Sequence, residues 1–234
     1  MNFTKINKKE IITNTILENH FLILVLERFN IGFGLQEKTI EEMCQEKEIN
    51  VNLFLTICNL HINKTIENNL NLNNNNIQKI VEYLQNSHNY YITELIPNIS
   101  GQIEDFVKSR KEKDLTFILI ERFFNVYKNE VFKHLEYEER FVFPYITNLL
   151  SQNETNTNYK INEYKYNHKD IESKLNELKN LLIKYLPEKN DRKFRRNFLF
   201  DLFRLERDLN IHTIIEERIL VPSIEKIEKK QKNR

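Results

Sequence analysis

The chain has 234 residues, which suits one large domain or one domain with a small companion. Hydrophobic residues make up 40% and charged residues 29%, an ordinary composition for a globular protein, and the formal net charge is only +1. This balance of charge excludes the strongly basic classes, so we expect neither a nucleic-acid partner nor a membrane partner.

Three further features concern the compartment of the chain. Residues 1–5 show no apolar h-region of a signal peptide. The six apolar residues 21–26 are far too few to span a bilayer. Cys44 and Cys58, 14 residues apart, match neither a disulfide framework nor a zinc knuckle. We therefore expect a cytoplasmic protein, with both cysteines acting as small buried apolar residues.

Residues 1–67 are predicted to form a small helical N-terminal domain. Apolar residues recur at helical spacing over residues 11–29, and residues 30–34 indicate a turn. Thr39 and Glu42 have the spacing of a capping box, and Asn50 is placed to cap the following helix. We expect His20 and His61 to be structural or surface residues.

An Asn-rich linker, residues 68–76, precedes a second predicted domain at residues 77–230. Glycine and proline are rare and β-type alternation is scarce, so the fold class is all-α. The long helices are expected from about residue 77 to beyond a kink at Pro97, and over about 114–150, 160–185 and 192–229. Pro144 and Pro222 are expected to bend their helices.

One phrase occurs twice in the second domain. Residues 134–144 and 212–222 both read His, three residues, Glu-Glu-Arg, three apolar residues, Pro. Four residues of α-helix advance by one full turn and about 40° more and rise about 6 Å, so His134 shares a face with Glu138, as His212 does with Glu216. The second glutamate of each copy, Glu139 or Glu217, should face solvent. The apolar triplets should pack next to the site.

A further histidine precedes each copy of this phrase. His88 lies 46 residues before His134, and His168 lies 44 residues before His212. Each of the two lies in a stretch with helical periodicity. The chain therefore predicts two helical hairpins that pack as a four-helix bundle, with one histidine-bearing face on each helix.

Two interpretations of this pattern compete. A single histidine on an apolar helix face is usually a satisfied core residue, and one His-x-x-x-Glu pair is common on a helix surface. Two matched copies, each with a preceding histidine at a similar distance, are hard to explain in that way. Burying six polar groups without partners would cost several kcal/mol, and a metal removes that cost. We therefore favour a metal site.

The types of ligand narrow the choice of metal. Imidazole with carboxylate suits iron, manganese or zinc. Six ligands exceed what one tetrahedral zinc needs, so two metals bridged by two glutamates fit better. No glutamate lies three residues before any histidine, which argues against the ferritin and carboxylate-rich oxygenase class.

This arrangement of His, His-x-x-x-Glu, His and His-x-x-x-Glu resembles the hemerythrin-like domain of the RIC (repair of iron centres) family. Residues 29–42 also resemble the short N-terminal domain that often precedes it, although Gly34-Leu35 stands where the family carries a Cys-Cys pair. The oxygen-carrying hemerythrins have five histidines and a terminal His-x-x-x-x-Asp, so the resemblance is to the repair family.

The resemblance implies a pair of iron ions joined by an oxo or hydroxo bridge. It assigns one iron to His88 and His212, the other to His134 and His168, and a bridging role to the two glutamates. The six implied metal ligands are His88, His134, Glu138, His168, His212 and Glu216.

Two functions follow as expectations from this resemblance. The first is repair of iron–sulfur clusters damaged by nitric oxide or oxidative stress, with iron–sulfur proteins as clients. The second is a sensor that binds O₂ or NO. In either case the chain would donate iron or bind a small ligand such as O₂, NO or peroxide, rather than act as a turnover enzyme.

Overall fold

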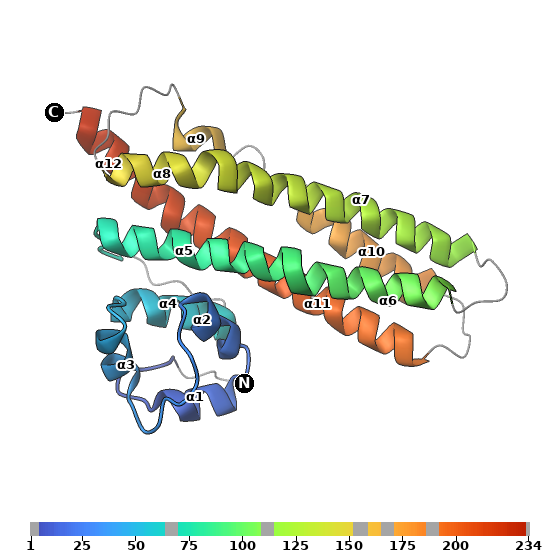
Figure 1. The fold of residues 1–234 in the computed structure, drawn as a ribbon, viewed down its shortest axis with the longest axis horizontal. Coiled ribbons are helices and arrows are strands. Elements are labelled where there is room, and N and C mark those ends of the chain that lie inside the picture. The colour runs from blue at the N-terminus through green and yellow to red at the C-terminus, as the bar shows by residue number, and fades with distance from the viewer. Residues whose placement is uncertain are drawn as a thin grey trace. The chain divides into compact units, whose positions relative to one another are not determined.

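The computed structural model describes residues 5–63, 70–108, 115–151, 159–164, 171–185 and 192–232. These residues are almost entirely helical, and the β-type pairing among them is one isolated bridge between Ile11 and Thr39. The all-α fold class predicted from the sequence is therefore confirmed (Figure 1). None of the described helices is long and apolar enough to cross a membrane.

Helices α1–α6, with one π-helical turn, cover the first half of the chain. Their bounds are α1 Ile12–Glu18, α2 Leu22–Arg28, α3 Ile40–Glu46, α4 Val51–Asn63, α5 Asn74–Tyr90, η1 Tyr91–Leu95 and α6 Ile96–Lys108. The second half holds α7 Leu115–Tyr137, η2 Glu138–Val142, α8 Phe143–Leu150, α9 Ile161–Tyr164, α10 Ile171–Tyr185, α11 Arg192–Ile215, η3 Glu216–Leu220 and α12 Val221–Lys232.

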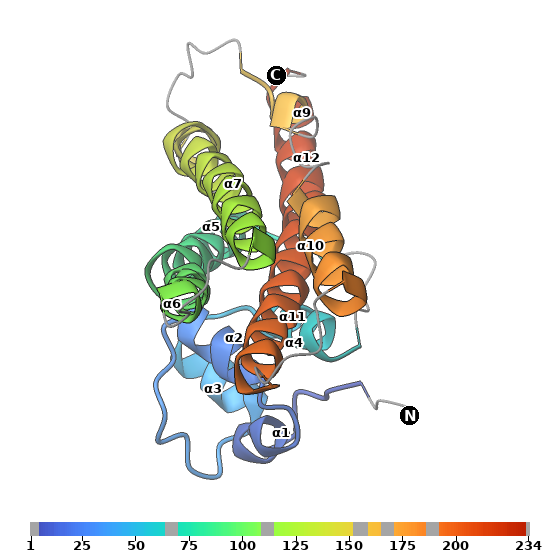
Figure 2. The same ribbon diagram turned by 90° about the vertical axis from the view of Figure 1, so that its right-hand side faces the viewer.

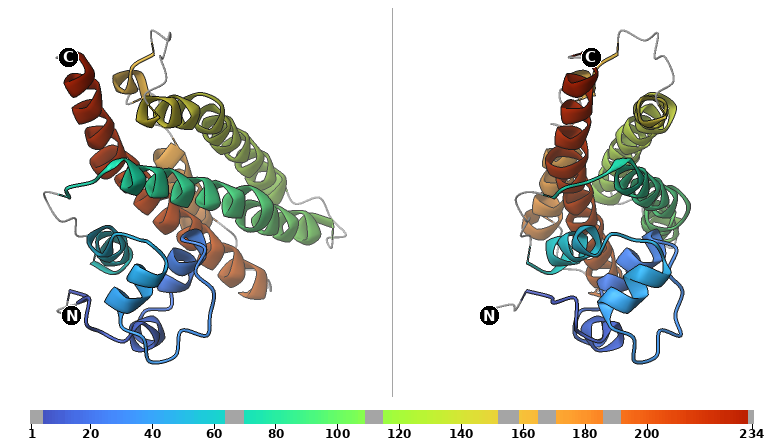
Figure 3. Two further views of the ribbon diagram at one scale, coloured as in Figure 1. Left: turned by 60° about the vertical axis from the view of Figure 1, so that its left-hand side comes forward. Right: turned by 90° about the vertical axis from the view of Figure 1, so that its left-hand side faces the viewer.

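The chain divides into two compact units. One unit comprises Met1–Asn86 with Ile214–Arg234, and the other comprises Ser87–Thr213. In the first unit, α1–α4 gather around a small core (Figure 3). The fully buried side chains of Ile12, Val25 and Ile40 belong to that core.

Local capping explains where several helices of the first unit begin. Thr39 and Glu42 form the predicted capping box at the start of α3. The Asn50 side chain accepts a hydrogen bond from the Leu53 backbone N–H at 3.0 Å, as expected of a cap for α4. Helix α5 begins at Asn74, inside the predicted linker, because Asn73 and Asn76 cap it reciprocally, each amide oxygen accepting the other's backbone N–H.

Two thiols and one imidazole of the first unit are buried. Cys44 and Cys58 are both free and buried, as predicted. Burial raises the pKa of the Cys44 thiol to about 12 and raises that of Cys58 well above its usual value. His61 is also buried, and its Nε2 lies 3.0 Å from the hydroxyl of Tyr83. This pair is a structural contact between α4 and α5.

The second unit is a bundle of four helical arms, which run beside one another in Figures 1 and 2. The arms are η1–α6, α7–η2–α8, α10 and α11. The Phe106 ring stacks on Phe194 at 3.9 Å and tilts against Phe117 at 4.5 Å, which ties three arms together. An ion pair between Lys174 and Glu130 at 2.6 Å joins α10 to α7.

A π-helical turn precedes each of three prolines. Pro97, Pro144 and Pro222 each follow a five-residue π-helical turn by two positions. Proline lacks an N–H and its ring crowds the carbonyl four residues earlier, which here lies inside the π-helical turn. The wider turn relieves that crowding. The helical run continues through each proline, so Pro97 does not interrupt its helix, and the bends expected at the three prolines stay predictions.

Candidate metal centre

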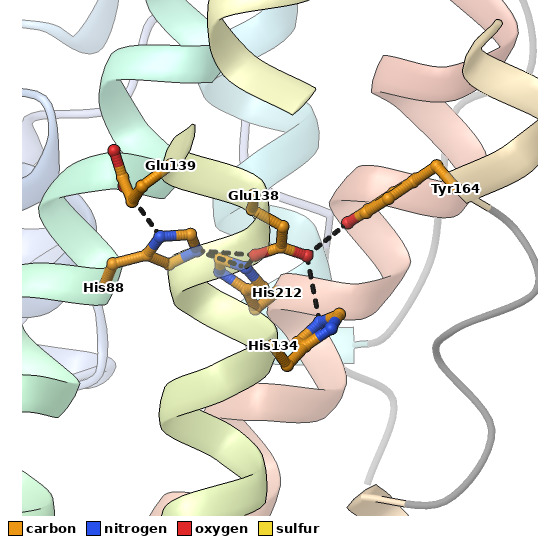
Figure 4. Close-up of polar contacts among 6 residues, drawn as sticks. All are labelled: His88, His134, Glu138, Glu139, Tyr164 and His212. Carbon is orange, nitrogen blue, oxygen red and sulfur yellow. Dashed lines mark hydrogen bonds and ion pairs between the residues drawn. The ribbon is translucent and has the colours of Figure 1, made fainter. Parts of the chain in front are cut away.

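Four of the six predicted ligands lie on α5, on α7 with η2, and on α11. His88 is near the end of α5, just before η1. His134 lies in the last turn of α7, Glu138 opens η2 directly after it, and His212 lies in the last turn of α11. Figure 4 shows the imidazoles of His88, His134 and His212 pointing toward the carboxylate of Glu138.

Glu138 is the centre of this cluster, and its side chain is completely buried. Its Oε1 lies 2.9 Å from Nε2 of His134 and 2.5 Å from the hydroxyl of Tyr164. Its Oε2 lies 3.0 Å from Nε2 of His88 and 4.0 Å from Nε2 of His212. The two carboxylate oxygens therefore face different histidines.

His88 is held from both sides of its ring. Its Nδ1 lies 2.8 Å from Oε1 of Glu139, while its Nε2 lies 3.1 Å from Nε2 of His212 (Figure 4). A carboxylate accepts but cannot donate a hydrogen bond when ionised, so Glu139 favours the proton on Nδ1. The lone pair on Nε2 of His88 then points toward Glu138 and His212, as a metal ligand requires.

Glu139 departs from the expectation that it faces solvent. Its side chain is one-third exposed, with a relative accessibility of 33%, and it reaches His88. Glu139 follows Glu138 in η2, and its carboxylate lies beside His88 of α5. Its counterpart Glu217 is exposed, as predicted.

Aromatic rings and apolar side chains surround the imidazoles. The Phe143 ring stacks on His88 at 5.4 Å, and the Tyr91 ring meets His212 edge-on at 5.8 Å. The apolar triplets at 141–143 and 219–221 are buried, except for Phe141, which is 56% exposed, and Phe143 packs next to the site as predicted. These neighbours keep water away from the histidines and lower the local dielectric constant.

The donor set fits a cation. His88, Glu138, His212 and Glu216 are all buried, and each offers one ligand atom within 4.8 Å of the others. Two imidazole nitrogens 3.1 Å apart can share only one proton, so at least one lone pair faces the other ring. Buried carboxylates beside such nitrogens are costly without a positive charge. A bound metal ion supplies that charge.

The predicted ligands differ in how exposed they are and in whether the structure describes them. Glu216 is fully buried at the first position of η3, one helical turn after His212. Among the described ligand histidines His134 is the most accessible, with 13% of its side chain exposed. His168 lies outside the described residues, so its position as a ligand stays a prediction.

Tyr164 is a neighbour of the cluster that the sequence did not single out. It lies at the end of the short helix α9, and its hydroxyl donates to Oε1 of Glu138. Tyr159, Tyr164 and Tyr166 occur close together in the sequence. Tyr164 lies four residues before His168 in the sequence, and this spacing could have pointed to Tyr164 as a neighbour of the site.

An apolar groove lies elsewhere on the bundle, between α7 and α10. Its volume is about 490 Å³, and it contains none of the six predicted ligands. The lining residues are Thr116, Leu119, Ile120, Arg122, Phe123, Val126, Leu178 and Leu181.

A helical bundle with a buried histidine–glutamate cluster defines a metal-binding protein of the non-haem iron class. The sequence comparison agrees, because the Hemerythrin HHE cation binding domain matches residues 79–224. The chain belongs to this hemerythrin family. None of the curated proteins compared with the chain matches it.

Proposed function

We propose that the chain carries two iron ions, bridged by oxo or hydroxo, held by the six residues His88, His134, Glu138, His168, His212 and Glu216. The observation that carries this proposal is the division of Glu138 between two groups of histidines. One carboxylate oxygen faces His134 and the other faces His88 and His212. A carboxylate divided in this way can bridge two metal ions.

The facing nitrogens of His88 and His212 support their assignment to one iron. His134, on the other side of Glu138, would then serve the second iron with His168. A bound iron pair supplies redox chemistry and a position for O₂, NO or peroxide. Around it, Glu139 orients His88, while Phe143 and Tyr91 restrict water.

The function that this site supports best is repair of iron–sulfur clusters damaged by nitrosative or oxidative stress, with iron donated to a client protein in the cytoplasm. Four histidines give fewer nitrogen ligands than the oxygen carriers have, which favours a site that can release iron. The RIC resemblance of residues 29–42 supports the same role.

An O₂ or NO sensor is the second candidate, and one observation favours it. Gly34 has a φ of +89°, a conformation suited to glycine, and Gly34-Leu35 replaces the Cys-Cys pair of the RIC N-terminal domain. Cys44 and Cys58 are buried thiols and do not replace that pair. Thiol chemistry would therefore be absent from this region.

Iron transfer separates the two candidates. The iron-loaded chain is mixed with an iron–sulfur enzyme inactivated by NO, and the activity of that enzyme is followed against free ferrous iron at equal concentration. A repair protein restores more activity than free iron does. A sensor leaves the enzyme inactive, and its own visible spectrum changes on exposure to O₂ or NO. Finding one zinc and no iron in protein made with ample iron would contradict both.

A further inference from the structure

Tyr164 contacts the predicted ligand Glu138 but is not itself one of the six predicted ligands. Tyr164 is 1% exposed, and its hydroxyl donates to Oε1 of Glu138 at 2.5 Å. Hydrogen bonds from a hydroxyl to a carboxylate are short and strong when the acceptor is charged, with typical lengths of about 2.5–2.7 Å. Figure 4 shows this phenol approaching Glu138 from a different side than His88 does.

The segment that carries Tyr164 is anchored independently of this hydrogen bond. Ile161 is completely buried, and the Tyr159 ring packs edge-on against Tyr145 of α8 at 5.0 Å. A short helix held at two other points can present a side chain at a defined position. The hydroxyl of Tyr164 is therefore placed by the fold rather than by Glu138 alone.

Among the described residues, the Tyr164 hydroxyl and Nε2 of His134 both lie within hydrogen-bond distance of Oε1 of Glu138. An imidazole nitrogen that binds a metal uses its lone pair and carries no proton, so it cannot donate from the same atom. If His134 binds iron through Nε2, its hydrogen bond to Glu138 is lost. The Tyr164 hydroxyl can keep its hydrogen bond to Glu138, because it is not one of the groups proposed to bind iron.

We propose that Tyr164 is a positioning residue for the bridging carboxylate: its hydroxyl holds Oε1 of Glu138 so that Oε2 stays directed toward His88 and His212. This inference rests on the proposed iron site and deepens it, because it names a residue that sets how firmly iron is retained. Hydrogen-bond partners of metal ligands typically change metal affinity by about 10- to 100-fold.

The test is Tyr164→Phe in the full-length chain, which removes the hydroxyl and keeps the ring. Tyr83→Phe is the matched control, because Tyr83 is also buried and its hydroxyl lies 3.0 Å from His61. Both variants and the wild type are loaded anaerobically with ferrous iron. Iron per chain, the rate of iron removal by a chelator and the visible spectrum of the oxidised protein are then measured.

We expect Tyr164→Phe to lose iron about 10- to 100-fold faster than the wild type, in line with the effect of other partners of metal ligands. Tyr83→Phe should lose iron at the wild-type rate. The wild-type spectrum should contain no phenolate-to-iron charge-transfer band, since the phenol keeps its proton. Removal rates within two-fold for Tyr164→Phe and the wild type would overturn the inference.

Two other outcomes are also decisive. A visible charge-transfer band that disappears in Tyr164→Phe would make Tyr164 a ligand and overturn the positioning role. If the wild type itself holds no iron, the proposed iron site fails, whereas loading of both chains followed by equal rates of iron removal refutes the Tyr164 inference alone. Should Tyr164→Phe fail to fold, resonance Raman spectra of wild-type tyrosine report whether the hydroxyl remains a donor after loading, and loss of that donor signal refutes the inference.

Discussion

His61 and His88 are both buried histidines, each with a nitrogen close to another side chain, yet their surroundings differ. Nε2 of His61 lies 3.0 Å from the hydroxyl of Tyr83, and the Arg28 guanidinium lies over the ring of that tyrosine. A hydroxyl and a neutral imidazole can each serve as donor or acceptor, so this pair satisfies itself. It needs no ion.

His88 lies instead among groups that compete for protons. Its ring nitrogens face two carboxylates, Glu138 and Glu139, and a second imidazole, His212. Such a cluster concentrates lone pairs and negative charge in a buried place, and a cation stabilises it. A buried histidine is therefore a better candidate for a metal ligand when carboxylates and a facing imidazole accompany it.

The largest expected effect comes from removing the shared carboxylate. Glu138→Ala should abolish iron binding, because both carboxylate oxygens face histidines and alanine offers neither. His61→Phe, which changes the buried histidine paired with Tyr83, should leave iron per chain unchanged. Metal analysis after desalting checks both variants. Iron retained by Glu138→Ala at the wild-type level would show that this carboxylate is not a ligand.

Loss of iron on mild acidification is the next effect in size. Metal-bound histidines must be neutral, and free imidazole has a pKa of about 6.5, so protons compete with the metal below that pH. We expect iron to be lost as the pH falls from about 7 to 5, where the protonated imidazole becomes the favoured form. Iron that elutes with the protein at about pH 5 would contradict histidine ligation.

Iron should also raise the thermal stability of the chain. A ligand that binds the folded chain and not the unfolded one stabilises it by about 2.7 kcal/mol at 100 times its dissociation constant. The iron-loaded protein should therefore melt at a higher temperature than the iron-free protein. The same comparison with Glu138→Ala is the control, and its melting temperature should not respond to iron. A response equal to that of the wild type would place the stabilising metal elsewhere.

A smaller effect is expected from the carboxylate that holds His88. Glu139→Gln keeps the size of the side chain but weakens its acceptor, so iron affinity should fall by about 10-fold or more. Glu136→Gln is the control and should change little, since the Glu136 side chain is 61% exposed and pairs with Arg140 on the surface of the bundle. A competition titration with a chelator measures both. Equal losses in the two variants would mean that the contact of Glu139 with His88 does not support iron binding.

The sequence predicted the features that depend on local spacing. His134 and Glu138 lie one helical turn apart, and the structure joins them at 2.9 Å. The capping box of α3 was visible for the same reason. Glu139 was placed wrongly, because its contact with His88 joins residues 51 apart in the chain and cannot be read from helical spacing. Glu217, at the same position of the π-helical turn η3, is exposed as predicted.

Contacts between distant residues were beyond sequence reasoning. Tyr164 and Glu138 are 26 residues apart, and His61 and Tyr83 are 22 apart, with no periodic pattern that relates either pair. The same holds for the contact of His88 with His212, 124 residues later, which the family resemblance implied and spacing did not. Such contacts follow from packing of the bundle as a whole.

The smallest expected effect concerns the cysteines of the first unit, which lie far from any proposed ligand in the sequence. Burial raises the pKa of the Cys44 thiol to about 12, and it also raises the pKa of Cys58. Both residues therefore remain protonated thiols at pH 8. The thiolate is the reactive form, and a rise of three pKa units lowers its fraction roughly 1,000-fold. A thiol reagent at pH 8 should therefore modify native protein far more slowly than protein unfolded in guanidinium.

The raised pKa of Cys44 also predicts that the folded chain becomes less stable at high pH. A thiol whose folded pKa lies above its unfolded value stabilises the fold below the unfolded value, near 9, and this contribution is lost as the pH rises toward about 12. The unfolding midpoint of the iron-free chain should fall over that window, and Cys44→Ala should fall less steeply. Rapid modification of native protein at pH 8, with iron content unchanged, would show that these thiols are open to solvent, and the first unit would then have a reactive site of its own.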